Sequence, residues 1–275
     1  MTLNCKGHLI DLSTPKVMGI LNCTPDSFFD GGKYLDENAI LKQTEKMLND
    51  GATFIDAGGY SSRPGAKHVS EEEEIRRMLP LTELLTTNFP DIILSIDTFR
   101  SKVASTCLDA GAAMINDISA GKLDENMLPT VAKFHVPYIM MHMRGTPQNM
   151  QDQTNYDNLL VDIVTYFSER IAKAKAVGII DIIVDPGFGF AKTLEQNYEI
   201  LQKLNLLQNL EHPLLVGVSR KSMIYKVLKI DAKSALNGTT ALNMASLMNG
   251  ANILRVHDVK EAYECVKLAE ELMPC

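Results

Sequence analysis

The chain has 275 residues, of which 45% are hydrophobic and 22% are charged, an ordinary composition for a globular protein. Its formal net charge is −7 and its pI is near 5.4. A chain with this acidic balance offers no basic surface for nucleic acid or for an anionic membrane, and we expect neither partner. An enzyme for anionic substrates would need a local group of cations to work against this overall charge.

Five cysteines are scattered along the chain without the paired spacing of a zinc site or a redox motif: Cys5, Cys23, Cys107, Cys265 and Cys275. Their odd number and irregular spacing favour reduced thiols over a disulfide framework. The first residues lack the long apolar core of a signal peptide, and no apolar run reaches the length of a membrane span. We therefore expect a cytoplasmic protein.

Short runs rich in valine, isoleucine and leucine recur along the chain, and each is followed by a stretch with helical character. This alternation is typical of a parallel sheet covered by helices. The eight runs span residues 17–21, 53–55, 92–96, 113–115, 137–141, 182–184, 214–218 and 252–254. We expect capping boxes at Ser70 with Glu73, Thr193 with Gln196 and Asp258 with Glu261, and helix ends at Gly51, Gly111 and Gly178. The acidic run at residues 71–74 predicts the solvated first turn of a helix.

Eight such units predict an α/β protein with a closed (β/α)₈ barrel in a single domain, and an open doubly wound sheet is the competing architecture. Polar residues follow all eight runs: Asn22, Asp56, Asp97, Asn116 with Asp117, His142, Asp185, Ser219 to Lys221, and Arg255 with His257. A barrel gathers such residues at one end, whereas an open sheet spreads them along an edge. We therefore favour a barrel enzyme, with residues 1–15 as an N-terminal cap segment and residues 16–273 as the barrel.

Two loops of the predicted barrel carry residues suited to a small ligand. Residues 22–32 (NCTPDSFFDGG) follow the first strand, and their two aromatic and two acidic side chains suit a mobile lid. Residues 58–65 (GGYSSRPG) follow the second strand, and they offer backbone N–H groups and one arginine to an anion. Either loop could also be a polar turn, so neither is a specific signal by itself.

The loop after the sixth strand, residues 185–190 (DPGFGF), does not form a dinucleotide-binding motif. The third glycine is missing, and the acid precedes the glycines instead of lying about twenty residues beyond them. His142 has no second metal ligand at helical spacing, and we expect it to be a packed histidine among methionines.

Cationic residues cluster after the last two strands. Arg220 and Lys221 open a helix after the seventh strand, and Arg255 and His257 leave the eighth. These two loops and a nearby helix N-terminus commonly bind phosphate in barrels. The residues alone therefore predict a barrel enzyme for a small anionic substrate.

Five segments resemble the dihydropteroate synthase family in order and in spacing: residues 19–28 (GILNCTPDSF), 59–66 (GYSSRPGA), 185–190 (DPGFGF), 219–224 (SRKSMI) and 255–259 (RVHDV). The resemblance covers nearly the whole predicted barrel, and the first segment is its most specific part. It implies an enzyme that condenses 6-hydroxymethyl-7,8-dihydropterin diphosphate with 4-aminobenzoate to give 7,8-dihydropteroate and diphosphate in folate biosynthesis. The family alone implies a homodimer and a sulfonamide target.

The resemblance also implies roles for individual residues. It assigns the pterin to Asp97, Asn116, Asp185 and Lys221, and the diphosphate to Asn22, Ser62, Arg255 and His257. It places 4-aminobenzoate among Phe28, Arg63, Pro64, Phe190, Ser219 and Ser222, with Ser222 anchoring the carboxylate. The expected catalytic residues are Asp97, Lys221, Arg255 and His257. At position 62 the family more often has threonine, and the serine found here keeps the hydroxyl group.

A Mg²⁺ ion on the substrate diphosphate is implied as well, with Asn22 as its protein ligand and Asp30 as a further ligand if the first loop closes. Whether Asp26 or Asp30 meets the metal stays open. Mg²⁺ prefers hard oxygen donors and usually keeps several waters. In the implied mechanism, the ion, Arg255 and His257 stabilise the departing diphosphate, Asp97 stabilises a pterin methylene cation, and the aryl amine then attacks.

Two other functions fit part of the pattern. A methyltransferase that uses a reduced folate on the same barrel would share the pterin-binding residues, but it would need neither the first loop nor residues 63–65. A catalytically silent paralogue that only binds pterins would not need to retain the catalytic residues together. Diphosphate release that depends on 4-aminobenzoate would separate these three functions.

Overall fold

The structure is a computed structural model, and it describes residues 1–22, 29–30, 34–35, 37–60 and 69–272. Eight parallel strands of this part of the chain form the central sheet: β3 (Lys16–Asn22), β6 (Phe54–Gly58), β7 (Leu94–Asp97), β8 (Met114–Asp117), β9 (Tyr138–Met141), β10 (Ile182–Asp185), β11 (Leu215–Val216) and β12 (Ile253–Val256). They lie in the order β10-β9-β8-β7-β6-β3-β12-β11.

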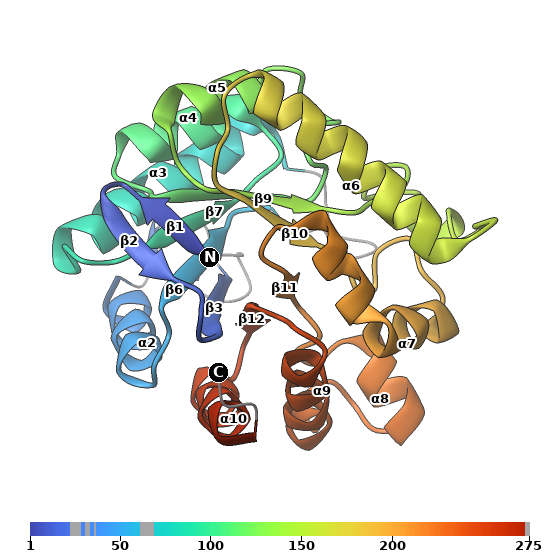
Figure 1. Cartoon of the computed structure of the whole chain (residues 1–275). Coiled ribbons are helices and arrows are strands. Elements are labelled where there is room, and N and C mark those ends of the chain that lie inside the picture. The colour runs from blue at the N-terminus through green and yellow to red at the C-terminus, as the bar shows by residue number, and fades with distance from the viewer. Residues whose placement is uncertain (23–28, 31–33, 36, 61–68, 273–275) are drawn as a thin grey trace.

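The two ends of this strand order meet. Val184 of β10 forms a parallel bridge with Leu214, and its N–H donates to the Pro213 carbonyl at 2.9 Å. The sheet therefore closes on itself, as Figure 1 shows from one end. The predicted (β/α)₈ barrel is confirmed, and the open doubly wound sheet is excluded.

Helices surround the barrel on its outside (Figure 1). In chain order, the described α-helices are α2 (Glu37–Asn49), α3 (Glu71–Asn88), α4 (Ser101–Asp109), α5 (Met127–Phe134), α6 (Leu159–Ala176), α7 (Leu194–Gln202), α8 (Ser222–Leu228), α9 (Leu236–Met248) and α10 (Val259–Leu272). The connections contain the 3₁₀ helices η1 (Met150–Asp152) and η2 (Leu204–Leu210) and the antiparallel pair β4 (Phe29–Asp30) and β5 (Tyr34–Leu35). None of the helices described has both the length and the apolarity that crossing a membrane requires.

The three helices begin where predicted, directly after Ser70, Thr193 and Asp258. Thr193 and Gln196 form a full capping box before α7, with N···O distances of 3.2 and 2.9 Å. At α3 only half of the box forms, because Ser70 accepts from the Glu73 N–H while the Glu73 carboxylate binds Arg77. The expected glycine ends at Gly51, Gly111 and Gly178 all have positive φ, at 104°, 110° and 97°.

The capping box expected at Asp258 and Glu261 was wrong. Both carboxylate oxygens of Asp258 accept from Arg220, with the Nε at 2.8 Å and the Nη2 at 2.7 Å. A bidentate guanidinium contact is stronger than a single N-cap bond, so the carboxylate faces Arg220 and not the first turn of α10.

A hairpin of β1 (Thr2–Cys5) and β2 (His8–Asp11) covers the amino-terminal end of the barrel (Figure 1). Leu3, Cys5 and Leu12 are buried with side chains that come from or adjoin all eight strands: Met18, Phe54, Ile93, Met114, Ile139, Ile183, Leu215 and Ile253. The separate, larger apolar core lies between the sheet and the helices. Because the amino-terminal end is filled, functional residues must act from the carboxyl ends of the strands.

We predict that Leu3→Ala lowers the free energy of unfolding by about 2–4 kcal/mol, because it leaves a cavity in this apolar plug. Leu3 is 1% exposed, whereas Leu9 on the other strand of the same hairpin is 73% exposed. Leu9→Ala is therefore the matched control, with an expected change within about 0.5 kcal/mol. Urea denaturation measures both, and equal effects would show that the hairpin does not stabilise the barrel.

Candidate active site

Four polar side chains from alternate strands form one layer inside the barrel. Asp56 of β6 is in register with Ser95 of β7, which is in register with Met114 of β8. Because barrel strands are tilted, the residue level with Asp56 lies two positions further along β8, at Asn116. The same shift continues to Asp185 on β10 and Arg255 on β12. The layer therefore contains two carboxylates, one amide and one guanidinium, just above the apolar plug.

Arg255 is the centre of this layer. Its Nε donates to Asp56 Oδ2 at 2.6 Å, and its Nη2 donates to Asp97 Oδ2 at 2.9 Å. Asn116 Nδ2 donates to the same Asp56 oxygen at 3.0 Å. The predicted residues Asp97, Asn116 and Arg255 are thus brought together, and Asp56 joins them as a residue to which sequence reasoning assigned no role. Its signal was its place at the end of a strand.

The charged side chains of this group shift one another's pKa values. Burial raises the pKa of Asp97 to about 7, with Arg255 opposing the shift and Asp56 adding to it. Burial also works against the charge on Arg255, but Asp56 and Asp97 outweigh it and raise the pKa of the guanidinium above its ordinary value. Arg255 is therefore always a cation here, whereas Asp97 can gain or lose a proton near neutral pH.

Asp185, the last residue of β10, and Lys221, in the segment between β11 and α8, lie beside the Arg255 group. One Asp185 oxygen accepts from the Gly187 N–H at 2.7 Å, and burial raises the pKa of its carboxyl. Lys221 donates to the Phe188 carbonyl at 2.7 Å, and its Nζ lies 4.9 Å from the centre of the Phe190 ring. Burial lowers the pKa of Lys221 to about 8, and Asp185 opposes that shift. Both side chains are thus held in place by the backbone of one loop.

His257 and Ser219 are neighbours on the loops after β12 and β11. The His257 backbone N–H donates to Ser219 Oγ at 3.1 Å, and the same hydroxyl lies 3.0 Å from His257 Nδ1. The Ser219 hydroxyl thus fixes the orientation of the His257 ring at Nδ1. Ser222 is the first residue of α8. The assignment of Ser219 and Ser222 to a 4-aminobenzoate site remains a prediction.

Several predicted site residues lie outside the part of the chain that the structure describes: Phe28, Ser62, Arg63 and Pro64. Asn22 is the last residue of β3 and pairs in register with Gly58 of β6, which places it at the carboxyl end of the barrel. The Asp30 backbone pairs with Tyr34, and its side chain is outside the description. Within the described residues, no cluster of three His, Cys, Asp or Glu side chains could hold a metal ion.

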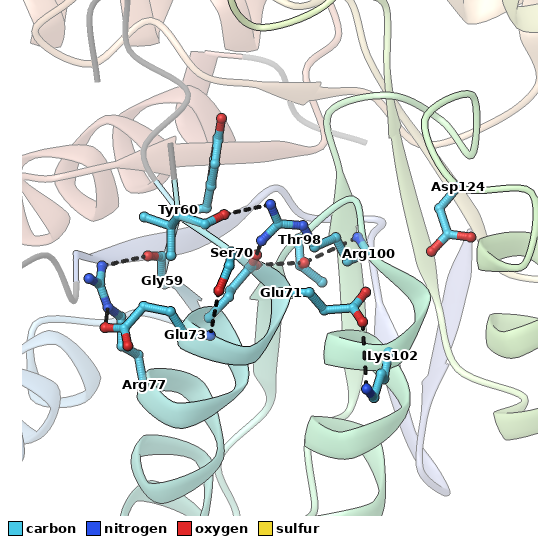
Figure 2. A network of polar contacts seen from close by, with 12 residues as sticks. Gly59, Tyr60, Ser70, Glu71, Glu73, Arg77, Thr98, Arg100, Lys102 and Asp124 are labelled. Atoms are coloured by element: carbon cyan, nitrogen blue, oxygen red, sulfur yellow. Dashed lines mark hydrogen bonds and ion pairs between the residues drawn. The ribbon is translucent and has the colours of Figure 1, made fainter. Parts of the chain in front are cut away.

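A polar network supports the chain next to Asp97 (Figure 2). The carboxylate of Glu74 on α3 is fully buried; it accepts from Arg100 Nη1 at 2.5 Å and from Thr98 Oγ1 at 2.7 Å. Arg100 Nη2 in turn donates to the Val69 carbonyl at 2.6 Å. The expectation that the acidic run at residues 71–74 is solvated was therefore wrong for Glu74.

The network reaches both sides of the second predicted loop. Arg77 donates to the Gly59 carbonyl at 3.3 Å and to Glu73 at 2.7 Å (Figure 2). The Arg100 guanidinium lies 5.4 Å from the centre of the Tyr60 ring. Gly59 and Tyr60 at the start of the loop, and Val69 after it, are thus tied to two arginines that are themselves held by carboxylates of α3.

The comparisons with known proteins agree with this arrangement. Residues 18–257 match the family described as pterin binding enzyme. The chain is 42% identical to the dihydropteroate synthase of Escherichia coli K12 over 272 residues, which cover 98% of this chain and 96% of that protein.

Solved structures give the same result. The Yersinia pestis dihydropteroate synthase in complex with a sulfonamide drug has a TM-score of 0.93 at 44% identity, with 99% of both chains covered. The Xanthomonas albilineans dihydropteroate synthase with 4-aminobenzoic acid has a TM-score of 0.91 at 36% identity, with 100% of this chain and 98% of that chain covered. In sequence and in fold, the chain belongs to the pterin binding enzyme family.

Proposed function

We propose that the chain acts as a dihydropteroate synthase, joining 6-hydroxymethyl-7,8-dihydropterin diphosphate to 4-aminobenzoate with release of diphosphate. The observation that carries this proposal is the layer of Asp56, Asn116, Asp185 and Arg255 with Lys221 beside it. It sets acceptors and donors for a flat heterocycle next to a permanent cation. The near-full-length relatives that bear the name of this activity support the same conclusion.

Asp185 and Lys221 would bind opposite groups on the pterin ring. A pterin presents an amide N–H beside an exocyclic amine, and a carboxylate such as Asp185 can accept from both. Its orientation is set by the Gly187 N–H. Lys221 can donate to the ring carbonyl, and Asn116 adds a further amide beside Asp56. This hydrogen bonding would place the pterin deep in the barrel, with its methylene group toward the mouth.

Arg255 and His257 would stabilise the departing diphosphate. Two nitrogens of Arg255 are bound by Asp56 and Asp97, so the guanidinium is held rigid and need not reorganise as charge develops. Ser219 contacts His257 at Nδ1, and when Nε2 carries a proton, its N–H can donate to a phosphate oxygen. Asp97, beside Arg255, would stabilise positive charge on the pterin methylene group until the aryl amine attacks.

We also propose Mg²⁺ as the metal ion, with Asn22 as its protein ligand. The donor set fits: an amide oxygen is a hard ligand, and the described residues offer no acidic cluster that would hold the ion alone. Mg²⁺ commonly binds through one or two protein oxygens together with substrate phosphates and waters. When bound, it would neutralise charge on the leaving diphosphate.

A homodimer and a cytoplasmic location are further proposals. Large apolar side chains on and after α8 are partly exposed, at 51% for Val227, 49% for Leu228 and 38% for Ile230. Exposed apolar side chains so close together in the chain would suit a contact between subunits. The described cysteines Cys5, Cys107 and Cys265 are free thiols, which suits a reducing compartment. Sedimentation velocity would give the oligomeric state directly.

The purified chain should release diphosphate only when 4-aminobenzoate, the pterin diphosphate and Mg²⁺ are all present. EDTA should lower the rate at least about tenfold, because it removes charge neutralisation of the leaving group, and excess Mg²⁺ should restore it. A coupled diphosphate assay measures this. Binding of the pterin without turnover would favour the silent paralogue, and methyl transfer from a reduced folate would favour the methyltransferase.

Asp185→Asn should weaken pterin binding by about 10- to 100-fold, because one acceptor becomes a donor that faces the donor edge of the pterin. The exposed carboxylate of Asp157 offers a control, and Asp157→Asn should bind like the unmodified chain. Fluorescence titration with a pterin measures both variants. Unchanged affinity in Asp185→Asn would remove Asp185 from the site.

The stability of Asp97→Asn relative to the unmodified protein should rise between about pH 4 and pH 7. The pKa of Asp97 is 3.8 ordinarily and about 7 in the fold, so the fold binds more protons than the unfolded chain in this window. The unmodified fold therefore loses stability as pH rises, by at most about 1.4 kcal/mol per pH unit, whereas asparagine does not titrate.

Urea denaturation at intervals from pH 4.5 to pH 8 would measure this difference. It should increase up to about pH 7 and then level off. Asp157→Asn, which changes an exposed side chain, is the control for the loss of a carboxylate elsewhere. A flat difference for Asp97→Asn would mean that Asp97 keeps its ordinary pKa in the fold.

A further inference from the structure

A buried lysine that no motif identified lies behind the loop that carries Phe188 and Phe190. Lys192 is 5% exposed and stands between β10 and α7. Its Nζ lies 3.0 Å from the Phe190 carbonyl, 3.1 Å from the Gly187 carbonyl and 3.0 Å from His142 Nδ1. An ammonium has three N–H bonds, and here each has one acceptor.

The third acceptor is fixed by its own surroundings. Burial lowers the pKa of His142 to about 2, with Lys192 adding to the shift, so the imidazole is neutral. Its ring stands edge-on to Tyr166 at 4.8 Å between centroids, and its backbone N–H donates to the Asp185 carbonyl at 2.9 Å. A neutral His142 that cannot be protonated can accept from Lys192 at Nδ1, which requires the lysine to be the donor.

The loop is held from two sides by two lysines. Lys221 binds the Phe188 carbonyl, whereas Lys192 binds the carbonyls before and after it, those of Gly187 and Phe190. The Gly187 N–H in turn holds the Asp185 carboxylate. The loop also lies close against β9, since a Cβ on Gly187 would meet the His142 carbonyl oxygen at 2.4 Å. The orientation of Asp185 and Lys221 thus depends on the carbonyls that Lys192 binds.

Filling space would not require a charge at this position. A methionine has almost the same length and would avoid the cost of burying an ammonium. No carboxylate among the described residues forms an ion pair with Lys192. Its direct partners are loop carbonyls and an imidazole, and Asp185 offsets part of the desolvation without direct contact. The lysine is therefore suited to orient peptide groups.

We propose that Lys192 is a positioning residue for the pterin end of the site. Without touching substrate, its ammonium holds the loop of Gly187 to Phe190 so that Asp185 and Lys221 face the pterin. The inference rests on the proposed function, because it assigns the pterin to these two side chains. The proposal gives a role to a residue outside the site that the resemblance implies. It also explains why a charged side chain is buried behind that site.

Charged groups from several elements face Lys192. Burial lowers its pKa to about 7; Asp185 on β10 opposes the shift, and Lys221 before α8 and Arg144 after β9 add to it. His142 is neutral, and the Tyr156 hydroxyl donates to the Ala191 carbonyl at 2.8 Å. Loss of the Lys192 proton above neutral pH would therefore weaken pterin binding before Lys221, with its pKa at about 8, is deprotonated.

The test is Lys192→Met, with pterin affinity measured by fluorescence titration and both Michaelis constants by diphosphate release. The variant should bind pterin about 10- to 100-fold more weakly, while the KM for 4-aminobenzoate stays within about twofold at saturating pterin. Lys203→Met is the matched control, because Lys203 is half-exposed and pairs with Glu199 on α7. It should behave like the unmodified protein.

A second variant covers the case in which Lys192→Met does not fold. His142→Phe keeps a ring against Tyr166 but removes one of the three acceptors, so it should weaken pterin binding in the same direction by a smaller factor. Unchanged pterin affinity in a folded Lys192→Met, or equal loss toward both substrates, would overturn the proposal. An unmodified protein that binds pterin but releases no diphosphate would instead contradict the proposed function, and the titrations would still decide the role of Lys192.

Discussion

The two-residue repeat of the strands governs both ends of this barrel. Side chains that point inward at Phe54, Met114, Ile183 and Ile253 form the apolar plug with the hairpin. Two positions further along the same strands, the inward side chains are Asp56, Asn116, Asp185 and Arg255. A slip of one residue in any strand would turn its polar side chain into the layer beneath the helices. The packing that stabilises the fold therefore also sets the position of the functional groups.

Two different kinds of partner hold the buried charges above the plug. Arg255 lies between the carboxylates of Asp56 and Asp97, so opposite charges offset its desolvation. Lys192 and Lys221 are held chiefly by backbone carbonyls of one loop. The guanidinium is consequently a cation at all accessible pH values, whereas the lysines and Asp97 have pKa values brought toward neutrality. The site therefore combines a permanent cation at Arg255 with three groups whose charge can change near neutral pH.

Local sequence predicted the eight strands well, because each is a short apolar run ending in a polar residue. It also predicted the capping box of Thr193 and the glycine ends of three helices, which depend on neighbours within one turn. It predicted that Asp97, Asn116 and Arg255 meet, since parallel strands bring their carboxyl ends together. The roles of Phe28, Ser62, Arg63 and Pro64 rest on the resemblance alone and remain predictions.

What sequence reasoning missed depends on contacts between distant segments. Asp56 looked like any polar residue after a strand, and its contact with Arg255 follows from barrel tilt, which no local pattern records. Glu74 looked solvated because its run is acidic, yet Arg100 and Thr98 from the next unit bury it. Asp258 resembled a helix cap in the sequence, but its carboxylate binds Arg220, which lies 38 residues earlier in the chain. In each case a charged partner outweighed the local preference.

The hairpin at the amino-terminal end affects how ligands reach and leave the site. In the part of the chain that the structure describes, Leu3, Cys5 and Leu12 fill the base of the barrel, so both reactants would approach the polar layer from the opposite end. A ligand bound against the polar layer would then be covered by the one that binds after it, and the released diphosphate would leave by the same end. The order of binding and release would then affect the turnover rate as well as the chemical step.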